Sequence, residues 1–157
     1  MANDTKNVFI SHIHEDDEGL VKLKDLLKDN GMTIRDYSIN SDNPNNAKSE
    51  EYIKNEILAP RIRQSSVLVV YITPDTQDST YVDWEIEYAE GQNKRIVGVW
   101  AWGEAGCDIP ETLDQHYDAI VSWNGDHIFD AINGEFDGYE RPDGSPGDPR
   151  PIKRHPR

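Results

Sequence analysis

The sequence has little cysteine, little positive charge and no long apolar run. The single Cys107 excludes an intrachain disulfide and a cysteine-rich zinc site, as is typical of proteins of a reducing cytosol. No apolar run approaches the roughly 20 residues of a membrane-spanning helix, and the N-terminus lacks the charged and apolar regions of a signal peptide. We therefore expect a soluble, cytoplasmic protein that has no membrane partner.

Positive charge is scarce along the whole chain. The 157 residues carry 16 Lys and Arg side chains against 30 Asp and Glu, so the formal net charge is -14. Such a surface repels the phosphates of nucleic acid, which we exclude as a main partner. A small anionic ligand is compatible with this charge if hydroxyl groups, backbone N–H groups and one or two local cations bind it.

Several motifs of known enzymes are also missing. No GxGxxG or GxxxxGK[ST] stretch follows the first apolar run, so neither a standard Rossmann dinucleotide site nor a phosphate-binding P-loop is supported. The HIH stretch at 12–14 offers two imidazoles without a convincing third ligand, and we expect no metal site. No Cys–His pair suggests a nucleophile.

Apolar runs of strand type alternate with helical patterns along the chain, which predicts an α/β fold with right-handed crossovers and a parallel sheet. The run SVLVVYIT is nearly all β-branched, as in a central strand that is buried on both faces. Five strands favour a flavodoxin-like order, 2-1-3-4-5. The expected strands are 8–11, 32–39, 66–73, 94–102 and 119–123, and the expected helices lie near 18–30, 50–63, 79–90 and 127–133.

The composition changes at the C-terminal end. Five of the nine prolines lie in the segment from 138 to 157, which has almost nothing to bury. We therefore expect one domain over 1–137, followed by a disordered polar tail over 138–157.

One acidic residue of the stretch STYVDWEIEYAE, at 79–90, has an unusual place on its expected helix. At about 100° per residue, Glu85 falls between two apolar stripes, whereas the other acids of this helix fall on the opposite side. An ionised carboxylate at the edge of the buried side is costly unless something binds it. The alternative is that the Glu85 side chain extends to water from a half-buried position.

The expected topology places several polar residues near Glu85. Ligands of open α/β sheets bind beyond the carboxyl ends of the strands, where the strand order reverses, which here is between strands 1 and 3. Ser11 and His12 end strand 1, and the loop after strand 3 leads directly into the helix of Glu85. The sequence therefore predicts that these three residues lie at one site.

The stretches VFISH, SVLVVYIT, STYVDWEIEYA and KRIVGVW make residues 6–133 resemble a TIR-like domain. The resemblance is narrower to stand-alone bacterial members, which include the TIR partner of Thoeris anti-phage systems. It implies the flavodoxin-like sheet described above. Enzymatic TIR domains cleave the nicotinamide–ribose bond of NAD with one glutamate on the helix after strand 3, and that position here is Glu85.

The resemblance also implies other features of the site. It implies NAD as substrate without a further cofactor, a cyclic ADP-ribose-type product read by a separate effector, and self-association through TIR surfaces. The loop after strand 2, at 38–48, would approach the pocket of a neighbouring copy. The residues that we expect to contact NAD are Phe9, Ser11, His12, Asp36, Ser38, Ser79 and Trp84.

Two other functions remain open from the sequence. A TIR-like interaction module would keep the fold without using Glu85 in catalysis. An enzyme of the nucleoside deoxyribosyltransferase type would share the sheet and also attack an N-glycosidic bond with a glutamate.

Overall fold

The computed structural model describes residues 6–12, 18–34, 53–102, 107, 109–145 and 147 of the chain. Its centre is a six-stranded sheet in the order β2-β1-β3-β4-β5-β6, in which every neighbouring pair is parallel. The predicted parallel sheet and the order of its first five strands are confirmed. The strands are β1 (Asn7–Ser11), β2 (Thr33–Ile34), β3 (Val67–Ile72), β4 (Arg95–Trp100), β5 (Ala119–Val121) and β6 (Gly138–Tyr139).

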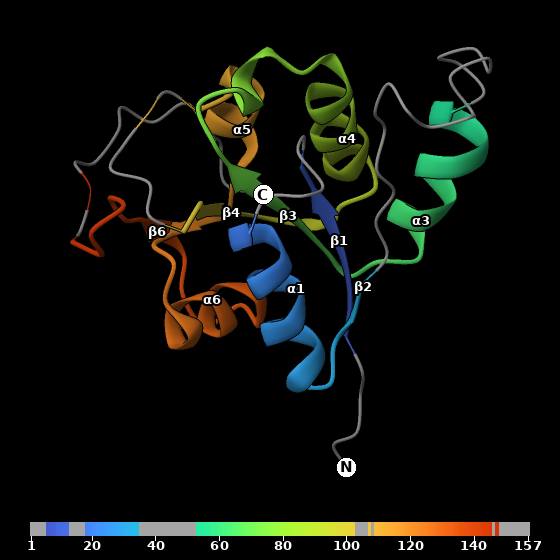
Figure 1. Ribbon diagram of the computed structural model, residues 1–157. Helices are drawn as coiled ribbons and strands as arrows, with labels where there is room; N and C mark the ends of the chain where they lie inside the picture. The colour runs from blue at the N-terminus through green and yellow to red at the C-terminus, as the bar shows by residue number, and fades with distance from the viewer. Residues whose placement is uncertain are drawn as a thin grey trace.

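Helices cover both faces of the sheet (Figure 1). One face packs against α1 and α6, and the other packs against α3, α4 and α5. The helices are α1 (Glu18–Asp29), the π-helix η2 (Ile53–Leu58), α3 (Ala59–Arg63), the 3-10 helix η3 (Thr76–Asp78), α4 (Thr80–Gly91), α5 (Glu111–His116) and α6 (Gly125–Ile132). None of these described helices is long and apolar enough to cross a membrane.

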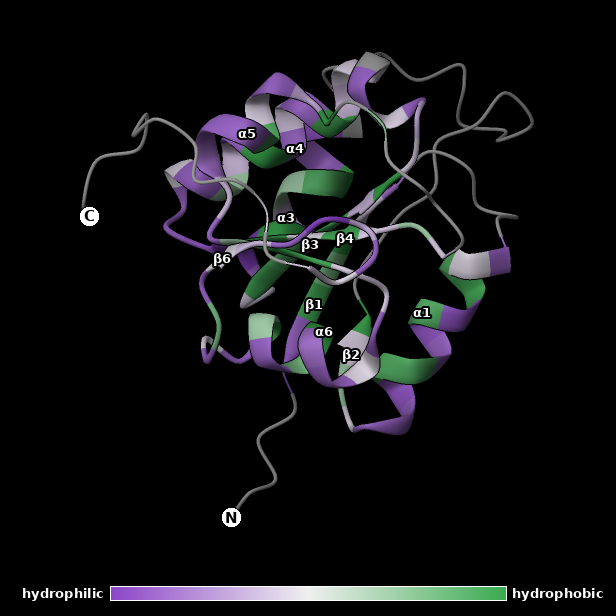
Figure 2. Cartoon of the chain, turned by 90° about the vertical axis from the view of Figure 1, so that its left-hand side faces the viewer, coloured by the Kyte–Doolittle hydropathy of each residue, from purple (hydrophilic) through white to green (hydrophobic). Residues whose placement is uncertain are grey.

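The sheet separates two apolar clusters. Side chains of a strand alternate between its faces, so Val8 and Ile10 of β1 join the cluster under α1 and α6, whereas Phe9 joins the cluster under α4. All six residues of β3 are buried, as its β-branched run predicts. Hydrophobic residues line the sheet and the inner sides of the helices, and hydrophilic residues lie outside (Figure 2).

The sixth strand corrects the predicted domain boundary. Disorder from Gly138 onward is wrong for the described part of this segment, because Gly138 and Tyr139 pair with β5. The ring of Tyr139 lies edge-on to Trp100, with 6.5 Å between centroids, and Trp100 Nε1 donates to the backbone oxygen of Glu140 at 2.8 Å. Main-chain pairing and one aromatic ring therefore hold a segment that has no apolar run. Residues 148–157 lie outside the described residues.

Two other expected elements differ in extent. Only residues 33–34 of the expected second strand are described as strand, and 35–39 lie outside the described residues. The expected helix near 50–63 is divided into η2 and α3. Pro60, at the start of α3, has no N–H to donate to the preceding turn, so a change of helix type at this point is physically reasonable.

Candidate active site

The carboxylate of Glu85 is buried beside the end of β1. Glu85 is only 4% exposed, and Ser11 is 1% exposed. The Ser11 hydroxyl donates to Glu85 Oε1 at 2.5 Å, which is in the short range of hydrogen bonds from a hydroxyl to a carboxylate. The predicted meeting of Ser11 and Glu85 is therefore confirmed, and the alternative of a Glu85 side chain extending to water is wrong.

Alternation along β1 and the phase of α4 together produce this contact. Ser11 is the last residue of β1, two positions after Phe9, and it therefore points to the same side as Phe9, toward α4. On α4, Val82, Ile86 and Ala89 are buried in the apolar cluster and fix the rotation of the helix on the sheet. Glu85 shares the buried side of the helix and meets Ser11 at the carboxyl-terminal edge of β1.

The start of α4 is fixed by Ser79. Its backbone is extended, and its hydroxyl accepts a hydrogen bond from the backbone N–H of Val82 at 3.2 Å. This is an N-cap, worth about 1 kcal/mol to a helix. Ser79, which we expected to contact NAD, therefore acts in the structure by setting the register that places Glu85 in the second turn of α4.

Trp84 lies on an aromatic surface between α4 and η2. Its ring stacks on Tyr88, with 5.0 Å between centroids and 11° between the ring planes. Lys54 of η2 places its ammonium 5.8 Å from the Trp84 ring and 5.9 Å from the Tyr81 ring, within cation–π range. The sequence does not predict this contact of Lys54. It shows only a cation in the expected helix before the strand at 66–73.

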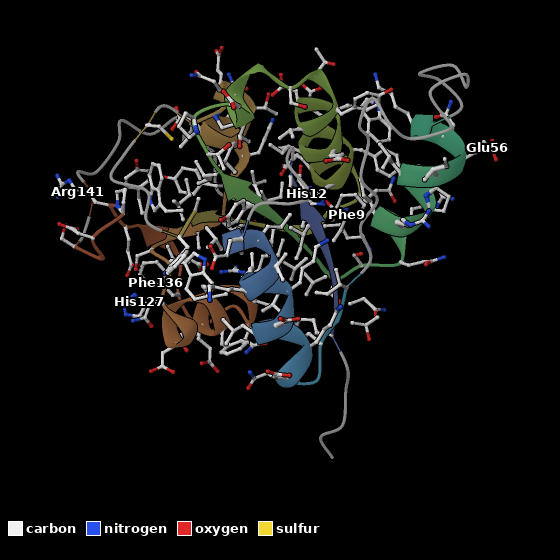
Figure 3. The ribbon with its side chains drawn as sticks, viewed as in Figure 1. Phe9, His12, Glu56, His127, Phe136 and Arg141 are labelled. Carbon is white, nitrogen blue, oxygen red and sulfur yellow. The ribbon has the colours of Figure 1, made fainter. Side chains whose placement is uncertain are left out.

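Phe9 and His12 lie at different depths of the same strand end. Phe9 is fully buried and packs beneath α4, so its ring supports the site from inside the core. His12 directly follows β1 and is half-buried, at the end of the strand nearest α4 (Figure 3). Asp36 and Ser38, the two remaining expected contacts, lie outside the described residues.

A second polar cluster lies at the carboxyl-terminal end of β5. Glu140 Oε1 accepts hydrogen bonds from the backbone N–H of Ser122 at 3.0 Å and from its hydroxyl at 3.3 Å, and it lies 3.0 Å from His127 Nδ1. These bonds connect the residue after β6 to β5 and to the first turn of α6. The sequence did not indicate this cluster, because Glu140 fell in the predicted tail.

No group of three or more His, Cys, Asp and Glu side chains is placed to hold a metal ion within the described ranges. Among the same residues, the buried polar ones are Ser11, Ser65, Thr76, Glu85 and Ser122. Glu85 is the one acid in this set. The chemistry of the site therefore centres on one carboxylate and the hydroxyl that is bonded to it.

Comparison with known families identifies the domain. A family model described as the TIR-like domain of the Thoeris protein ThsB matches residues 9–106, a span that contains both Ser11 and Glu85. The chain belongs to this family. No curated protein sequence matches this ThsB-type domain.

Two solved structures are similar to the ThsB-type domain. The CMP N-glycosidase BcmB of Clostridium botulinum is 12% identical, with a TM-score of 0.51 over 82% of this chain and 99% of that one. The TIR domain of the Toll-related receptor TRR-2 of Hydra magnipapillata is 18% identical, with a TM-score of 0.47 over 71% of this chain and 82% of that one. At such identities the similarity to BcmB concerns the fold alone.

Proposed function

We propose that this ThsB-type domain cleaves the N-glycosidic bond between nicotinamide and ribose in NAD, with Glu85 as the catalytic carboxylate. The observation that carries the proposal is the buried Glu85 side chain, which Ser11 binds at the edge of the sheet where α/β proteins place their ligands. Burying a carboxylate has a cost in stability, and a functional role is the common reason for accepting it.

The chemistry needs one carboxylate and no acid. When the C–N bond breaks, its electron pair stays with nicotinamide, which leaves as a neutral molecule and needs no proton. The ribose is left with oxocarbenium character, and a carboxylate beside it stabilises this positive charge more in the transition state than in the ground state. In a buried site this stabilisation is stronger than in water. Ser11 orients the carboxylate through its hydrogen bond.

The product depends on what attacks the ribose next. Attack by water gives ADP-ribose, and attack by a nucleophile of the same molecule gives a cyclic isomer of ADP-ribose. Membership of a Thoeris family supports the cyclic product as a diffusible signal for a separate effector in anti-phage immunity. Self-association of the domain during activity is part of the same proposal.

A second candidate is an N-glycosidase acting on a nucleoside or its 5′-monophosphate. It is favoured by the similarity of the fold to BcmB, which is a CMP N-glycosidase, over nearly the whole length of that protein. An enzyme of the deoxyribosyltransferase type belongs to the same class. Incubating the purified protein separately with NAD, CMP and deoxynucleosides, and identifying the products by mass, separates these activities.

The decisive variant is Glu85→Gln, which keeps the shape of the side chain and removes its charge. We expect it to abolish NAD consumption and to leave the fold intact by circular dichroism. Glu87→Gln is the matched control, because Glu87 is an exposed acid of the same helix. The assay is repeated with extract of phage-infected cells, in case the enzyme is inactive at rest. Full activity of Glu85→Gln would refute the proposed mechanism. If the parent protein consumes no NAD with or without the extract, an interaction module is favoured.

A further inference from the structure

An exposed tryptophan lies close to a lysine beyond the end of β4. Trp102 is 53% exposed, and the only other exposed large hydrophobic residue in the described part of the chain is Val21, at 47%. The ammonium of Lys22, in α1, lies 5.0 Å from the centre of the Trp102 ring. An exposed indole next to a cation is a surface on which a planar aromatic ring can stack.

The position of this pair relative to Glu85 follows from the strand register. Ser11 of β1 is level with Val70 of β3, which is level with Gly98 of β4. Trp102 therefore lies two strands away from Ser11, about 10 Å across the sheet, and four residues farther toward the carboxyl-terminal edge. Lys22 belongs to α1, which covers the face of the sheet opposite to α4 (Figure 1). A ligand whose one end lies at Glu85 can therefore meet Trp102 and Lys22 only with a remote part that passes over the carboxyl-terminal edge of the sheet.

Charge indicates which remote part fits this position. A diphosphate needs a local cation in a protein of net charge -14, and Lys22 is a cation beside the indole ring. Its present ionic neighbour is Glu18, at 4.0 Å, with side chains that are 46% and 74% exposed. An exposed pair of this kind contributes little, so a phosphate can replace Glu18 at low cost. Arg95, at the start of β4, lies at the amino-terminal end of the strand, away from Trp102. It donates to the backbone oxygens of Ala131 and Phe136, so it is not a cation for this surface.

The geometry points to Trp102 and Lys22 as the binding site for the adenosine diphosphate half of NAD, which rests on the proposed function. The adenine ring stacks on the indole of Trp102, and the Lys22 ammonium binds the diphosphate. Glu85 is then left to contact the nicotinamide ribose at the other end of the molecule.

A second copy of the chain is a less suitable occupant of this surface. A stable interface buries about 800 Å² on each partner and centres on a cluster of apolar side chains. Within the described residues, Trp102 and Val21 are the two exposed large hydrophobic side chains, and the side chain over the Trp102 ring is the charged Lys22. Such a patch suits one flat ring better than a protein partner.

The test measures binding of ADP, which lacks the nicotinamide ribose and cannot be cleaved at that bond. Titration calorimetry compares the full-length parent with Trp102→Ala, Trp102→Phe and Lys22→Gln. Val21→Ala is the matched control, because it removes a neighbouring exposed apolar side chain. We expect Trp102→Ala to weaken ADP binding by about five- to 150-fold, the range for loss of one base stack. Trp102→Phe retains most of the affinity, Lys22→Gln weakens binding of ADP more than that of adenosine, and Val21→Ala equals the parent.

Three results would overturn the inference. They are a parent that does not bind ADP at millimolar concentration, a Trp102→Ala variant that binds as the parent does, and a loss of self-association in Trp102→Ala at unchanged ADP affinity, measured by sedimentation. The Glu85→Gln variant separates this inference from the proposed function. If Glu85→Gln still consumes NAD, the mechanism fails, but ADP binding that depends on Trp102 still supports the site. If Glu85→Gln is inactive and ADP binding ignores Trp102, the mechanism stands and the site fails.

Discussion

A double-mutant cycle on Ser11 and Glu85 tests whether the buried hydrogen bond joins a hydroxyl to a charged carboxylate. Both residues are nearly inaccessible to water, and the distance from Ser11 Oγ to Glu85 Oε1 is 2.5 Å. A hydrogen bond to a charged group contributes about 1.5–3 kcal/mol, and a neutral one contributes about 1 kcal/mol. Ser11→Ala should therefore lower the free energy of unfolding by about 2 kcal/mol in the parent, or the melting temperature by about 4–8 °C.

The same substitution should be less damaging when Glu85 is already Gln. The amide oxygen of Gln can still accept from Ser11, but as a neutral group, so Ser11→Ala should cost only about 1 kcal/mol in that background. The difference, about 1 kcal/mol, is the coupling energy of the pair. Urea unfolding of the parent, the two single variants and the double variant measures all four stabilities under one condition.

One outcome of the double-mutant cycle would contradict this reasoning. Distant, independent sites add within about 0.3–0.5 kcal/mol. If the costs of Ser11→Ala with Glu85 and with Gln at position 85 agree within that margin, the carboxylate is not charged in its contact with Ser11, and the reasoning from a buried ion is wrong. A cycle on Ser65, whose hydroxyl donates to the backbone oxygen of Arg61 at 2.8 Å, should show no coupling to Glu85→Gln.

Three further predictions concern the sheet, and urea unfolding measures each of them. Gly98→Ala should lower stability by about 1–3 kcal/mol, because a Cβ there would lie 3.1–3.2 Å from side chains of β3, β5 and α5; equal stability would mean that the core yields easily. A chain ending at Asp137 should have a lower free energy of unfolding than one ending at Gly147, because only the longer chain keeps β6; equal free energies would mean that β6 adds no stability. Trp100→Phe should cost about 1 kcal/mol more than Trp123→Phe, because Trp100 Nε1 donates to a backbone oxygen, whereas Trp123 Nε1 has no acceptor within the described part of the chain; equal costs would contradict this.

The parts of the fold that depend on period and burial could be predicted from the sequence. The β-branched run at 66–73 predicted a strand buried on both faces, and β3 is one. The order of the first five strands followed from alternating strands and helices. The sixth strand could not be predicted in this way, because Gly138–Tyr139 has only two residues and no apolar pattern. Its position depends on contacts with Trp100 and Ser122, which lie far away in sequence.

The contact of Glu85 with Ser11 was predictable from the sequence, and the other surroundings of the site were not. The phase of α4 predicts that Glu85 lies at the edge of the buried side, and the strand order predicts that the end of β1 lies beside it. Lys54 and Trp102 gave no such signal, because the stacking of a cation on a ring depends on how two elements pack and not on spacing within either one. The hydroxyl of Ser79, an expected contact of NAD, forms the N-cap of α4, and its contact with a ligand stays a prediction.

The hydrogen bonds of the other buried hydroxyls show how the contact between Ser11 and Glu85 differs from them. Ser65 and Thr76 donate to backbone oxygens four and five residues away, so each satisfies a local turn. Ser122 donates to the carboxylate of Glu140, a residue that is partly exposed. The Ser11 hydroxyl instead crosses 74 residues of sequence to reach a buried carboxylate. A buried ion pair or acid is not a reliable source of stability, and apolar residues of similar volume usually serve the core as well or better. A carboxylate that local pattern disfavours, and that the fold nevertheless encloses and orients at the ligand edge of the sheet, is therefore best explained by the catalytic role that we propose for it.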